Sequence, residues 1–588
     1  MSRLWRYVAR YRLRLAAGIA CLVVATSLAM TVPWLVKTVV DGIAAGAGTR
    51  AVAPTLAAIV GIAVVLGVVR TASRALIFNV GRDVEFDLRN DLFAHLERLP
   101  LAFYQQGRTG DLMSRLVNDV GAVRMLLGPG ILNVINTPIY YAYGLAIMLS
   151  LDPTLTLAAL AVYPLALLFV KRSSRLLMER TLRVQEGLGE LSSRVQQNLA
   201  GMHVVKAYAC EEHELRAFQE LSADFQEANL RLARVRGFIG PVMNVVGGVG
   251  ALVVLWLGGR HVITGRLSVG DLVAFTGYLG LLAWPTMALG WMLSVLQRGR
   301  AALGRLNALF AVPPAIITPP GAEAPATVRG EIALRGVTFR YPGRPQGAPA
   351  LADVDLTIPA GRTVAIVGRT GAGKSTLVQL LPRLFDVDAG SVCLDGRDVR
   401  TLPLGWLRRA IGVVPQDPFL FSRTIGENVA FACDGDGEEN ARGNGHEHGV
   451  AWAVEAAGLG RDLADMPRGL DTVVGERGIT LSGGQKQRVT LARVLAAAPR
   501  VLVLDDALSS VDAATERDIL TRLRGFFRER TTILVAHRLT TVKEADLIVV
   551  VDEGRVVEAG DHEGLLSRGG VYADLFSQQA LEGELEAI

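Results

Sequence analysis

Eight residues in the second half of the chain have the spacing of a phosphate-binding loop. Residues 368–375 are Gly-Arg-Thr-Gly-Ala-Gly-Lys-Ser, which matches G-x-x-x-x-G-K-[ST] at every fixed position. An apolar run at 363–367 precedes them and a helix-forming segment at 376–381 follows, which is the context that this motif requires. Backbone N–H groups of such a loop converge on phosphate oxygens, and the helix start adds a favourable dipole. The sequence therefore predicts a nucleoside triphosphate site.

Two side chains of this loop and one further carboxylate have defined expected roles. Lys374 should reach the β- and γ-phosphates, and Ser375 should hold Mg²⁺. The apolar run 500–504 ends in Asp505, the arrangement of a Walker B strand, so Asp505 should lie beside Ser375 and Mg²⁺. The loop residues expected to bind ATP are Gly368, Arg369, Thr370, Gly371, Ala372, Gly373, Lys374, Ser375 and Thr376.

Between these two motifs lies a pentapeptide that points to a family. Leu481, Ser482, Gly483, Gly484 and Gln485 form the sequence LSGGQ. Here the chain resembles the ATP-binding cassette (ABC) transporters, of which LSGGQ is the signature, and the resemblance extends from about residue 5 to 580. A serine and glycines at a helix start offer hydroxyl and backbone donors to a γ-phosphate.

The resemblance implies roles for further residues. Tyr341 matches the aromatic residue that stacks on adenine. Gln416 matches the Q-loop glutamine, which belongs to both the catalytic and the Mg²⁺-binding sets, and His537 matches the switch histidine that contacts the γ-phosphate. The D-loop corresponds to Ser509, Ser510, Val511 and Asp512. Residues 474–478 resemble the X-loop of exporters, which contacts the second subunit.

The chain departs from the family pattern at one catalytic position. Members with full hydrolytic power carry Glu after the Walker B aspartate, whereas this chain has Asp506. The shorter side chain withdraws the carboxylate by roughly 1.5 Å, about one C–C bond. A positioning error of about 1 Å can cost on the order of 100-fold in rate. We therefore expect ATP binding to be retained and hydrolysis at this Walker site to be slow.

The same departure bears on the partner. In the family two cassettes dimerise head to tail, and each site combines the Walker motifs of one chain with the signature of the other. A weakened Walker B beside an intact signature is what one half of a heterodimeric exporter would show. A homodimer with two slow sites is the alternative, because Gln416, His537 and the signature are retained.

The first half of the chain has the composition of a membrane protein. The 588 residues are 51% hydrophobic and their mean hydropathy is +0.34. Arginines 3, 6, 10, 12 and 14 precede the first apolar run, which predicts a cytoplasmic N-terminus. Six charge-free stretches are long enough to span a bilayer: 15–36, 52–69, 125–151, 153–170, 238–257 and 272–296. An even number of spans returns the C-terminus to the cytoplasm, so we expect a multi-pass protein of the inner (plasma) membrane.

The pattern changes after these spans. Paired prolines at 313–314 and 319–320 predict a linker over 311–328, because proline pairs cannot continue a helix. We therefore divide the chain into an all-α transmembrane domain (1–310) and an α/β P-loop nucleotide-binding domain (329–588), the latter from its alternating strands and helices. Segments 103–119 and 201–208 resemble the two coupling helices of the family.

The cargo is less defined by the sequence. Polar or aromatic residues within the spans are candidates for the cargo cavity: Asn133, Asn136, Tyr140, Asn244, Tyr278, Trp284 and Trp291. They favour an amphipathic or lipid-like small molecule, although helix packing explains Asn and Tyr about as well. The spans exclude a soluble ATPase that acts on nucleic acid; an importer and a nucleotide-gated regulator stay open. The polar insertion at 434–449 is expected to be a surface loop, although His446 and His448 could attract a metal.

Overall fold

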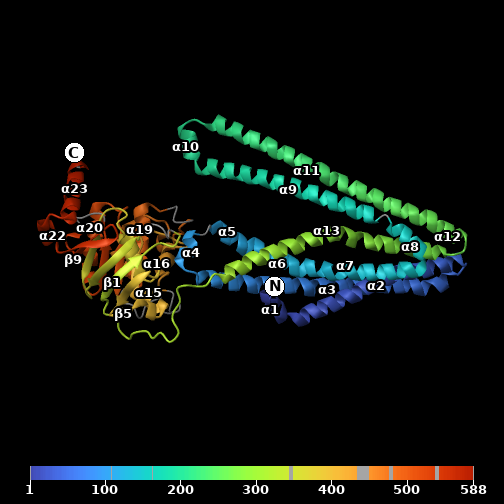
Figure 1. The fold of residues 1–588 in the computed structure, drawn as a ribbon, viewed down its shortest axis with the longest axis horizontal. Helices are drawn as coiled ribbons and strands as arrows, with labels where there is room; N and C mark the ends of the chain where they lie inside the picture. Colours follow the sequence, from blue (N-terminus) through green and yellow to red (C-terminus); the bar gives the residue numbers. More distant parts are fainter. Residues whose placement is uncertain are drawn as a thin grey trace. The chain divides into compact units, whose positions relative to one another are not determined.

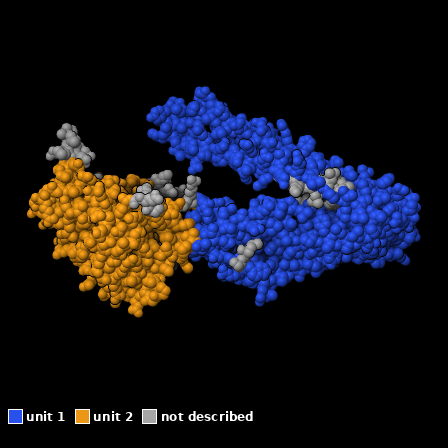
Figure 2. Space-filling model, viewed as in Figure 1, with its two compact units in different colours: residues 1–95, 110–311 blue, residues 96–109, 312–588 orange. Residues whose placement is uncertain are grey.

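The computed structural model describes residues 2–106, 109–161, 163–343, 348–433, 449–475, 481–536 and 542–586. They form two compact units (Figure 2), residues 1–95 with 110–311 and residues 96–109 with 312–588. We refer to these as the helical unit and the cassette unit. Residues 96–109 thus group with the cassette unit, a feature absent from the domain boundaries expected at 310 and 329.

Four helical stretches among the described residues are long and apolar enough to cross a membrane. They are Arg12–Ala44, Thr49–Glu97, Thr109–Leu151 and Val269–Ala311, and they contain the predicted spans 15–36, 52–69, 125–151 and 272–296. The predicted span 153–170 is divided between two helices, with residue 162 outside the described residues, and span 238–257 lies at the end of a long charged helix. The count of six spans stays a prediction.

The helices of the first 311 residues follow one another with short connections (Figure 1). They are α1 (Ser2–Arg10), α2 (Arg12–Ala44), α3 (Thr49–Glu97), α4 (Leu101–Gln106), α5 (Thr109–Ser114), η1 (Arg115–Asp119), α6 (Val120–Met125), η2 (Leu126–Gly130), α7 (Ile131–Leu151), α8 (Pro153–Leu160), α9 (Tyr163–Ala200), α10 (Met202–Ala207), α11 (Glu211–Val253), η3 (Val254–Gly258), α12 (Gly259–Ile263) and α13 (Val269–Ala311).

Helices α2, α3, α7 and α13 form the packed part of the helical unit. Their apolar contacts are joined by hydrogen bonds that cross between helices. The Tyr278 hydroxyl donates to Met30 O at 2.9 Å, and Ser73 Oγ donates to Gly18 O at 2.9 Å. Because a bilayer interior offers no water to polar groups, such bonds are the way for buried hydroxyls to be satisfied there.

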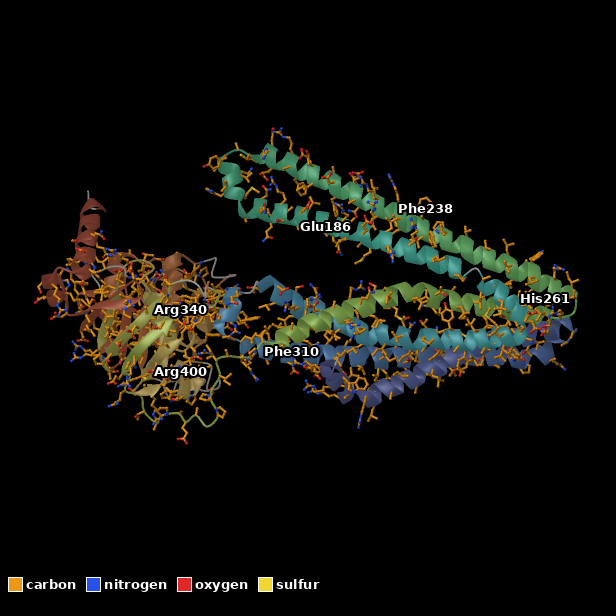
Figure 3. The ribbon with its side chains drawn as sticks, in the orientation of Figure 1. Glu186, Phe238, His261, Phe310, Arg340 and Arg400 are labelled. Carbon is orange, nitrogen blue, oxygen red and sulfur yellow. The ribbon has the colours of Figure 1, made fainter. Side chains whose placement is uncertain are left out.

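Helices α9 and α11 form a long hairpin with α10 at its tip (Figure 1). They pack along each other; α11 also contacts α8 and η3, and α9 also contacts α8 and α13. The Arg194–Glu214 ion pair of 2.7 Å joins them near the tip. A cavity of about 390 Å³ lies between them, lined largely by charged side chains that include Glu186 (Figure 3). The segment expected as the second coupling helix, 201–208, is this tip.

The cassette unit contains two sheets. A six-stranded sheet has the order β10-β9-β3-β8-β7-β6, with β9, β3, β8, β7 and β6 parallel, and a four-stranded antiparallel sheet has the order β2-β1-β4-β5. The strands are β1 (Ile332–Phe339), β2 (Leu351–Ile358), β3 (Thr363–Val367), β4 (Ala389–Leu394), β5 (Arg397–Asp398), β6 (Ile411–Val414), β7 (Val501–Asp505), β8 (Thr531–Val535), β9 (Leu547–Asp552) and β10 (Arg555–Gly560).

Helices cover the sheets and complete three apolar clusters. They are α14 (Lys374–Leu380), η4 (Val399–Thr401), α15 (Leu404–Ala410), α16 (Ile425–Ala430), α17 (Val450–Ala456), α18 (Gly460–Ala464), η6 (Gly469–Asp471), α19 (Gly483–Ala496), α20 (Ala513–Arg528), α22 (His562–Arg568) and α23 (Val571–Glu586). Strands β7 and β8 are fully buried and β3 is buried after Thr363, and each has a run of at least three apolar residues, as expected for a parallel sheet covered on both faces. The expected α/β fold of the cassette is confirmed.

Candidate nucleotide-binding site

The phosphate loop connects β3 to α14 at the carboxyl end of the parallel sheet. Two of its glycines are required by the geometry of the backbone. Gly368 has φ +151° and a Cβ there would lie 2.0 Å from Val551 O; Gly373 has φ +104° and a Cβ there would lie 2.7 Å from Ala350 O. Only glycine avoids both the clash and the backbone strain. The loop therefore holds the shape that an anion-binding turn requires.

Lys374, the first residue of α14, is buried within this loop. Its Nζ donates to Gly368 O at 2.7 Å and to Arg369 O at 3.0 Å. Burial lowers the pKa of Lys374, although the charges of Asp505 and Asp506 act in the opposite direction. The ammonium group is thus kept inside the loop, close to the backbone amides on which a phosphate would be bound.

The predicted metal ligands meet at the end of β7. Ser375 Oγ donates to Asp505 Oδ1 at 3.0 Å, and Asp505 itself is buried. A hydroxyl and a carboxylate are the hard oxygen ligands that Mg²⁺ prefers. Ser375 and Asp505 therefore fit a magnesium ion bound beside the phosphates.

Asp506 and Gln416 face each other next to these groups. Gln416 Nε2 lies 3.4 Å from Asp506 Oδ2, a long hydrogen bond. Asp506 has the left-handed φ of +49°, and its backbone N–H donates to Val535 O at 2.9 Å. This bond ties the Asp506 backbone to β8, which pairs with β7 so that Asp505 lies opposite Val535. The Asp506 backbone is therefore held in place and does not shift toward the nucleotide to make up for a side chain one methylene shorter than Glu.

Tyr341 lies beside the phosphate-loop helix. Its hydroxyl is 3.0 Å from Thr376 Oγ1, and its ring packs edge-on against Phe339 and Phe385. The structure thus brings Tyr341 to the site, whereas adenine stacking by its ring stays a prediction.

The signature residues begin α19 with a reciprocal cap. Gln485 N donates to Ser482 Oγ at 3.2 Å, and Ser482 N donates to Gln485 Oε1 at 3.0 Å. This capping box satisfies two N–H groups at the helix start. Gln485 Nε2 also donates to Asp462 Oδ1, and Arg488 forms an ion pair of 2.7 Å with Asp462. The signature is therefore held rigidly from within its own chain.

Gln487, which was not predicted from the sequence, joins the signature helix to the D-loop. Buried Gln487 donates through Nε2 to Ser509 Oγ and accepts from Ser510 N through Oε1, each at 2.9 Å. A Cβ on Gly484 would lie 2.9 Å from Ser510 O, so the two segments are in close contact. A long polar side chain on the largely apolar buried face of α19 was the available signal.

The remainder of the expected D-loop has a local structural role. Val511 is buried, and Asp512 caps α20 by accepting from Thr515 N at 2.9 Å. His537, residues 476–478 of the expected X-loop and residues 434–448 of the insertion lie outside the described residues.

The start of the first expected coupling segment, residues 103–106, belongs to the cassette unit, whereas residues 110–119 group with the helical unit. Ala102 of α4 packs against the apolar core. Residues 97–101 and Tyr104 line a cavity of about 470 Å³ together with linker residues 316–318 and Leu384, Leu404 and Arg408. Burial lowers the pKa of Arg408. The linker is anchored in the same place, since Leu404 N donates to Thr318 Oγ1 at 3.0 Å.

The candidate cargo residues of the helical unit have mixed surroundings. Tyr278 is fully buried against Met30, and Asn136 accepts a hydrogen bond of 2.7 Å from Thr26. Trp284 and Trp291 are exposed. Asn133 Nδ2 donates to Pro129 O in its own helix, and Asn244 is exposed. Several of these side chains therefore join helices or satisfy their own backbone.

Comparisons with known proteins cover both units. Residues 15–286 match the family described as the ABC transporter transmembrane region, and residues 351–509 match the ABC transporter family. The chain is 35% identical to the multidrug resistance-like ATP-binding protein MdlA of Escherichia coli (strain K12), over 99% of this chain and 97% of the relative. It is 31% identical to the ATP-dependent lipid A-core flippase of Syntrophus aciditrophicus (strain SB), over 99% and 95%. Among solved structures, a bacterial Atm1-family ABC exporter with ATP bound superposes with a TM-score of 0.78 at 29% identity, covering 97% of this chain and 99% of that one.

Proposed function

Because this chain belongs to the ABC transporter family, as an exporter with its transmembrane region and cassette fused, we propose that it exports an amphipathic or lipid-like small molecule. It is a multi-pass membrane protein and an ATP hydrolase coupled to transport. Exporters of this family work as dimers in a membrane. Two of the similar proteins are named for multidrug resistance and for lipid A-core flipping, which supports a cargo with an apolar part.

The dimer we propose is a heterodimer in which this chain has the slower Walker site. The observation that carries this proposal is the position of Asp506. Its backbone is bonded to Val535 O and its carboxylate reaches Gln416 Nε2 only at 3.4 Å. A partner with Glu at this position would contribute the faster Walker site, and Ser482, Gly483 and Gly484 of this chain would complete it.

A homodimer with two slow sites is the second candidate. Gln416 and Asp506 still face each other, and the signature retains its full capping box. The exposed apolar side chains of the α9–α11 hairpin are compatible with either dimer. Leu188, Val195 and Leu199 line a groove of about 790 Å³ there.

In either dimer ATP would be bound between Walker and signature residues of different chains. Magnesium, which neutralises charge between the β- and γ-phosphates when bound, would be held by Ser375, Asp505 and Gln416. Lys374 would exchange its bonds to Gly368 O and Arg369 O for phosphate oxygens. Closure would act on the membrane spans through the two expected coupling segments, 103–119 and 201–208, and so change the relative stability of two states of the transporter.

We further propose that both termini and the cassette are cytoplasmic. The arginines of α1 and the start of α2 form ion pairs with the polar half of α3, Arg10 with Asp87 at 3.0 Å and Arg14 with Asp83 at 3.1 Å. These pairs involve residues beyond the apolar segment 52–69. Basic residues next to a span favour the cytoplasmic side.

The test uses the purified chain alone, in proteoliposomes, with ATP hydrolysis and dye transport as readouts. Asp506→Glu should raise hydrolysis about 100-fold, because it restores the lost carboxylate reach. Asp552→Glu, the same change at the end of β9, is the matched control and should change nothing. Rapid transport-coupled hydrolysis by the unmodified chain alone would contradict an obligate partner, and an unchanged rate in Asp506→Glu would contradict a weakened Walker site.

A further inference from the structure

The chain passes between its two units at three places, and contacts within the helical unit join these places to one another. The crossings follow His95, precede Gly110 and follow Ala311. His95 Nε2 lies 3.2 Å from the carbonyl oxygen of Leu309, in the last turn of α13. The first and third crossings are therefore held together at the end of α13.

An ion pair joins the second crossing to the same part of α13. Asp119 ends η1, which follows α5 at this crossing, and Arg305 lies on α13 shortly before Ala311. Arg305 Nε donates to Asp119 Oδ2 at 2.9 Å, and its Nη2 donates to Asp119 Oδ1 at 2.5 Å. This bidentate geometry fixes the direction of both side chains as well as their distance.

The contacts next to this ion pair show that the two segments run antiparallel with little room to slide. Helix α13 packs along η1, α6 and η2. A Cβ on Gly299 of α13 would lie 2.9 Å from Leu126 Cβ, and one on Gly130 would lie 3.4 Å from Val295 Cγ1. The contact thus moves toward the start of α13 as the chain advances from η1 to η2. A glycine at each close contact lets the backbones approach, so the packing favours one register.

Stability alone does not account for a charged pair at this place. Asp119 is 6% exposed, and Val120, Val123 and Leu306, which lie close to the two charged residues in sequence, are almost fully buried. A carboxylate in such surroundings loses hydration that its attraction to a guanidinium roughly returns, so an apolar pair of similar volume is often as stable or more stable. A charged pair does penalise other registers, because a shift leaves the carboxylate without its partner. The pair is therefore better suited to set the register than to strengthen the packing.

The residues one turn away from Arg305 on α13 could not take its place. A slip of one turn in either direction would bring an alanine or Leu309 opposite Asp119, and neither side chain donates a hydrogen bond. On the other segment, Arg115 already pairs with Asp111 at 2.7 Å. The bidentate bond thus forms in one register of the two segments.

We propose that Arg305 is a positioning residue for transport. Through Asp119 it fixes the register of α13 against the first expected coupling segment, so that a displacement produced by the cassette moves α13 and α6 as one body. Both helices lead into predicted spans, 272–296 and 125–151, so the three crossings deliver one displacement to the membrane and not three independent ones. The inference deepens the proposed export function and rests on it.

The test removes the ion pair in two ways in the full-length chain. Arg305→Met alone leaves the Asp119 carboxylate buried without its partner, whereas Arg305→Met with Asp119→Leu replaces both charges by apolar groups. Arg10→Met with Asp87→Leu is the matched control, because this pair also joins two helices of the helical unit and combines an exposed arginine with a more buried carboxylate. Thermal unfolding in nanodiscs, and ATP hydrolysis and dye transport in inside-out proteoliposomes, are measured for each variant.

The double apolar variant separates a role in register from a role in stability. Arg305→Met should unfold at a lower temperature than the unmodified chain, and the double variant should regain that loss. The double variant should keep its ATP hydrolysis, yet transport per ATP hydrolysed should fall about tenfold, within the range expected for residues that couple two sites. The control pair should leave transport per ATP unchanged.

Two outcomes of this experiment would overturn the proposal. Full transport per ATP in a stable double variant would mean that the charges are not needed for coupling. A double variant no more stable than Arg305→Met would mean that the pair serves the stability of the fold.

The register itself is measured without ATP, which separates this inference from export. Spin labels on cysteines introduced at Val117 of η1 and Ala308 of α13, both exposed, report the distance between the segments by pulsed electron spin resonance. The four native cysteines are replaced by alanine, and labelled chain is diluted with unlabelled chain in nanodiscs. The unmodified pair should give one narrow distribution, and the double apolar variant a broader one or one displaced by about 5 Å, the rise of one helical turn.

The two readouts distinguish the failure of this inference from the failure of export. If the chain with the ion pair transports no dye but the distribution broadens in the double variant, export fails and the role of Arg305 in the register stands. An identical narrow distribution with and without the ion pair would refute that role, whatever the transport result.

Discussion

The two units use buried polar residues in different ways. In the cassette, Lys374, Ser375 and Asp505 converge on a place where a ligand would be bound, and their bonds to one another or to the loop are exchangeable. In the helical unit, buried Ser73 and Tyr278 are bonded to backbone carbonyls of another helix. Polar groups in the first case select a ligand, and in the second they hold helices in register.

The comparison predicts which quantity each mutation should change. Removing a polar group of the cassette site should change nucleotide affinity or rate more than stability. Removing one from the helical unit should change stability and leave nucleotide affinity as it was.

The largest effect is expected at the phosphate loop. Lys374→Ala should lower ATP affinity by about 100-fold or more, because hydrogen bonds to charged groups are worth about 1.5–3 kcal/mol each and this ammonium can form two. The measurement is equilibrium binding of ATP to the full-length chain in detergent. Lys543→Ala, an exposed lysine of the same unit, is the control. Unchanged affinity in Lys374→Ala would remove the basis of the nucleotide site.

A cassette residue outside the ligand-binding set should behave differently. Gln487→Leu should lower the stability of the cassette by about 1–3 kcal/mol, because Ser510 N and Ser509 Oγ lose a buried partner. Thermal unfolding followed by circular dichroism measures this, with Arg517→Ala on the exposed side of α20 as the control. The affinity of the Walker residues of this chain for ATP should be retained. A large loss of ATP affinity without a loss of stability would mean that Gln487 contributes to nucleotide binding and not mainly to the stability of the cassette.

Short-range patterns explain why the cassette site was largely predictable from the sequence. Gly368–Ser375 and Ser482–Gln485 are continuous motifs whose geometry is set by local backbone and caps, whereas their binding of ATP stays a prediction. Gln487 was missed because its partners, Ser509 and Ser510, are distant in sequence.

The helical unit was less predictable for the same physical reason. Apolar length identified four of the spans, yet nothing local distinguishes Tyr278, which packs against Met30, from a cargo residue.

Tyr278→Phe is the corresponding test in the helical unit. The fully buried hydroxyl donates to Met30 O, and its loss should reduce stability by about 1 kcal/mol, the net value of an ordinary hydrogen bond. Thermal unfolding of the chain in lipid nanodiscs measures the effect. ATP affinity should be unchanged, with Tyr143→Phe, an exposed tyrosine of α7, as the control. A drop in ATP affinity would contradict the separation between the two units.

The smallest effect is expected at the corner between α7 and α8, where it depends on pH. Asp152 Oδ2 lies 2.7 Å from Nδ1 of His261. His261 belongs to α12 and is labelled in Figure 3. Burial alone would raise the pKa of Asp152, but hydrogen bonds from Thr154, Leu155 N and His261 outweigh it and hold the pKa below its ordinary value of 3.8.

A carboxyl group whose pKa is lower in the folded state than in the unfolded state stabilises the fold at any pH above its ordinary pKa. This stabilisation is lost as the pH falls through the lowered pKa of the folded state. Asp152→Asn should therefore melt at a slightly lower temperature than the unmodified chain at neutral pH, and the difference should shrink in acid below pH 3.8. Thermal unfolding in nanodiscs over this pH range measures it. Asp465→Asn, a surface carboxylate of the cassette, should show no such convergence. A difference that grew in acid would mean that Asp152 is held in its protonated form, and its bonds to His261 and Leu155 N would then need another explanation.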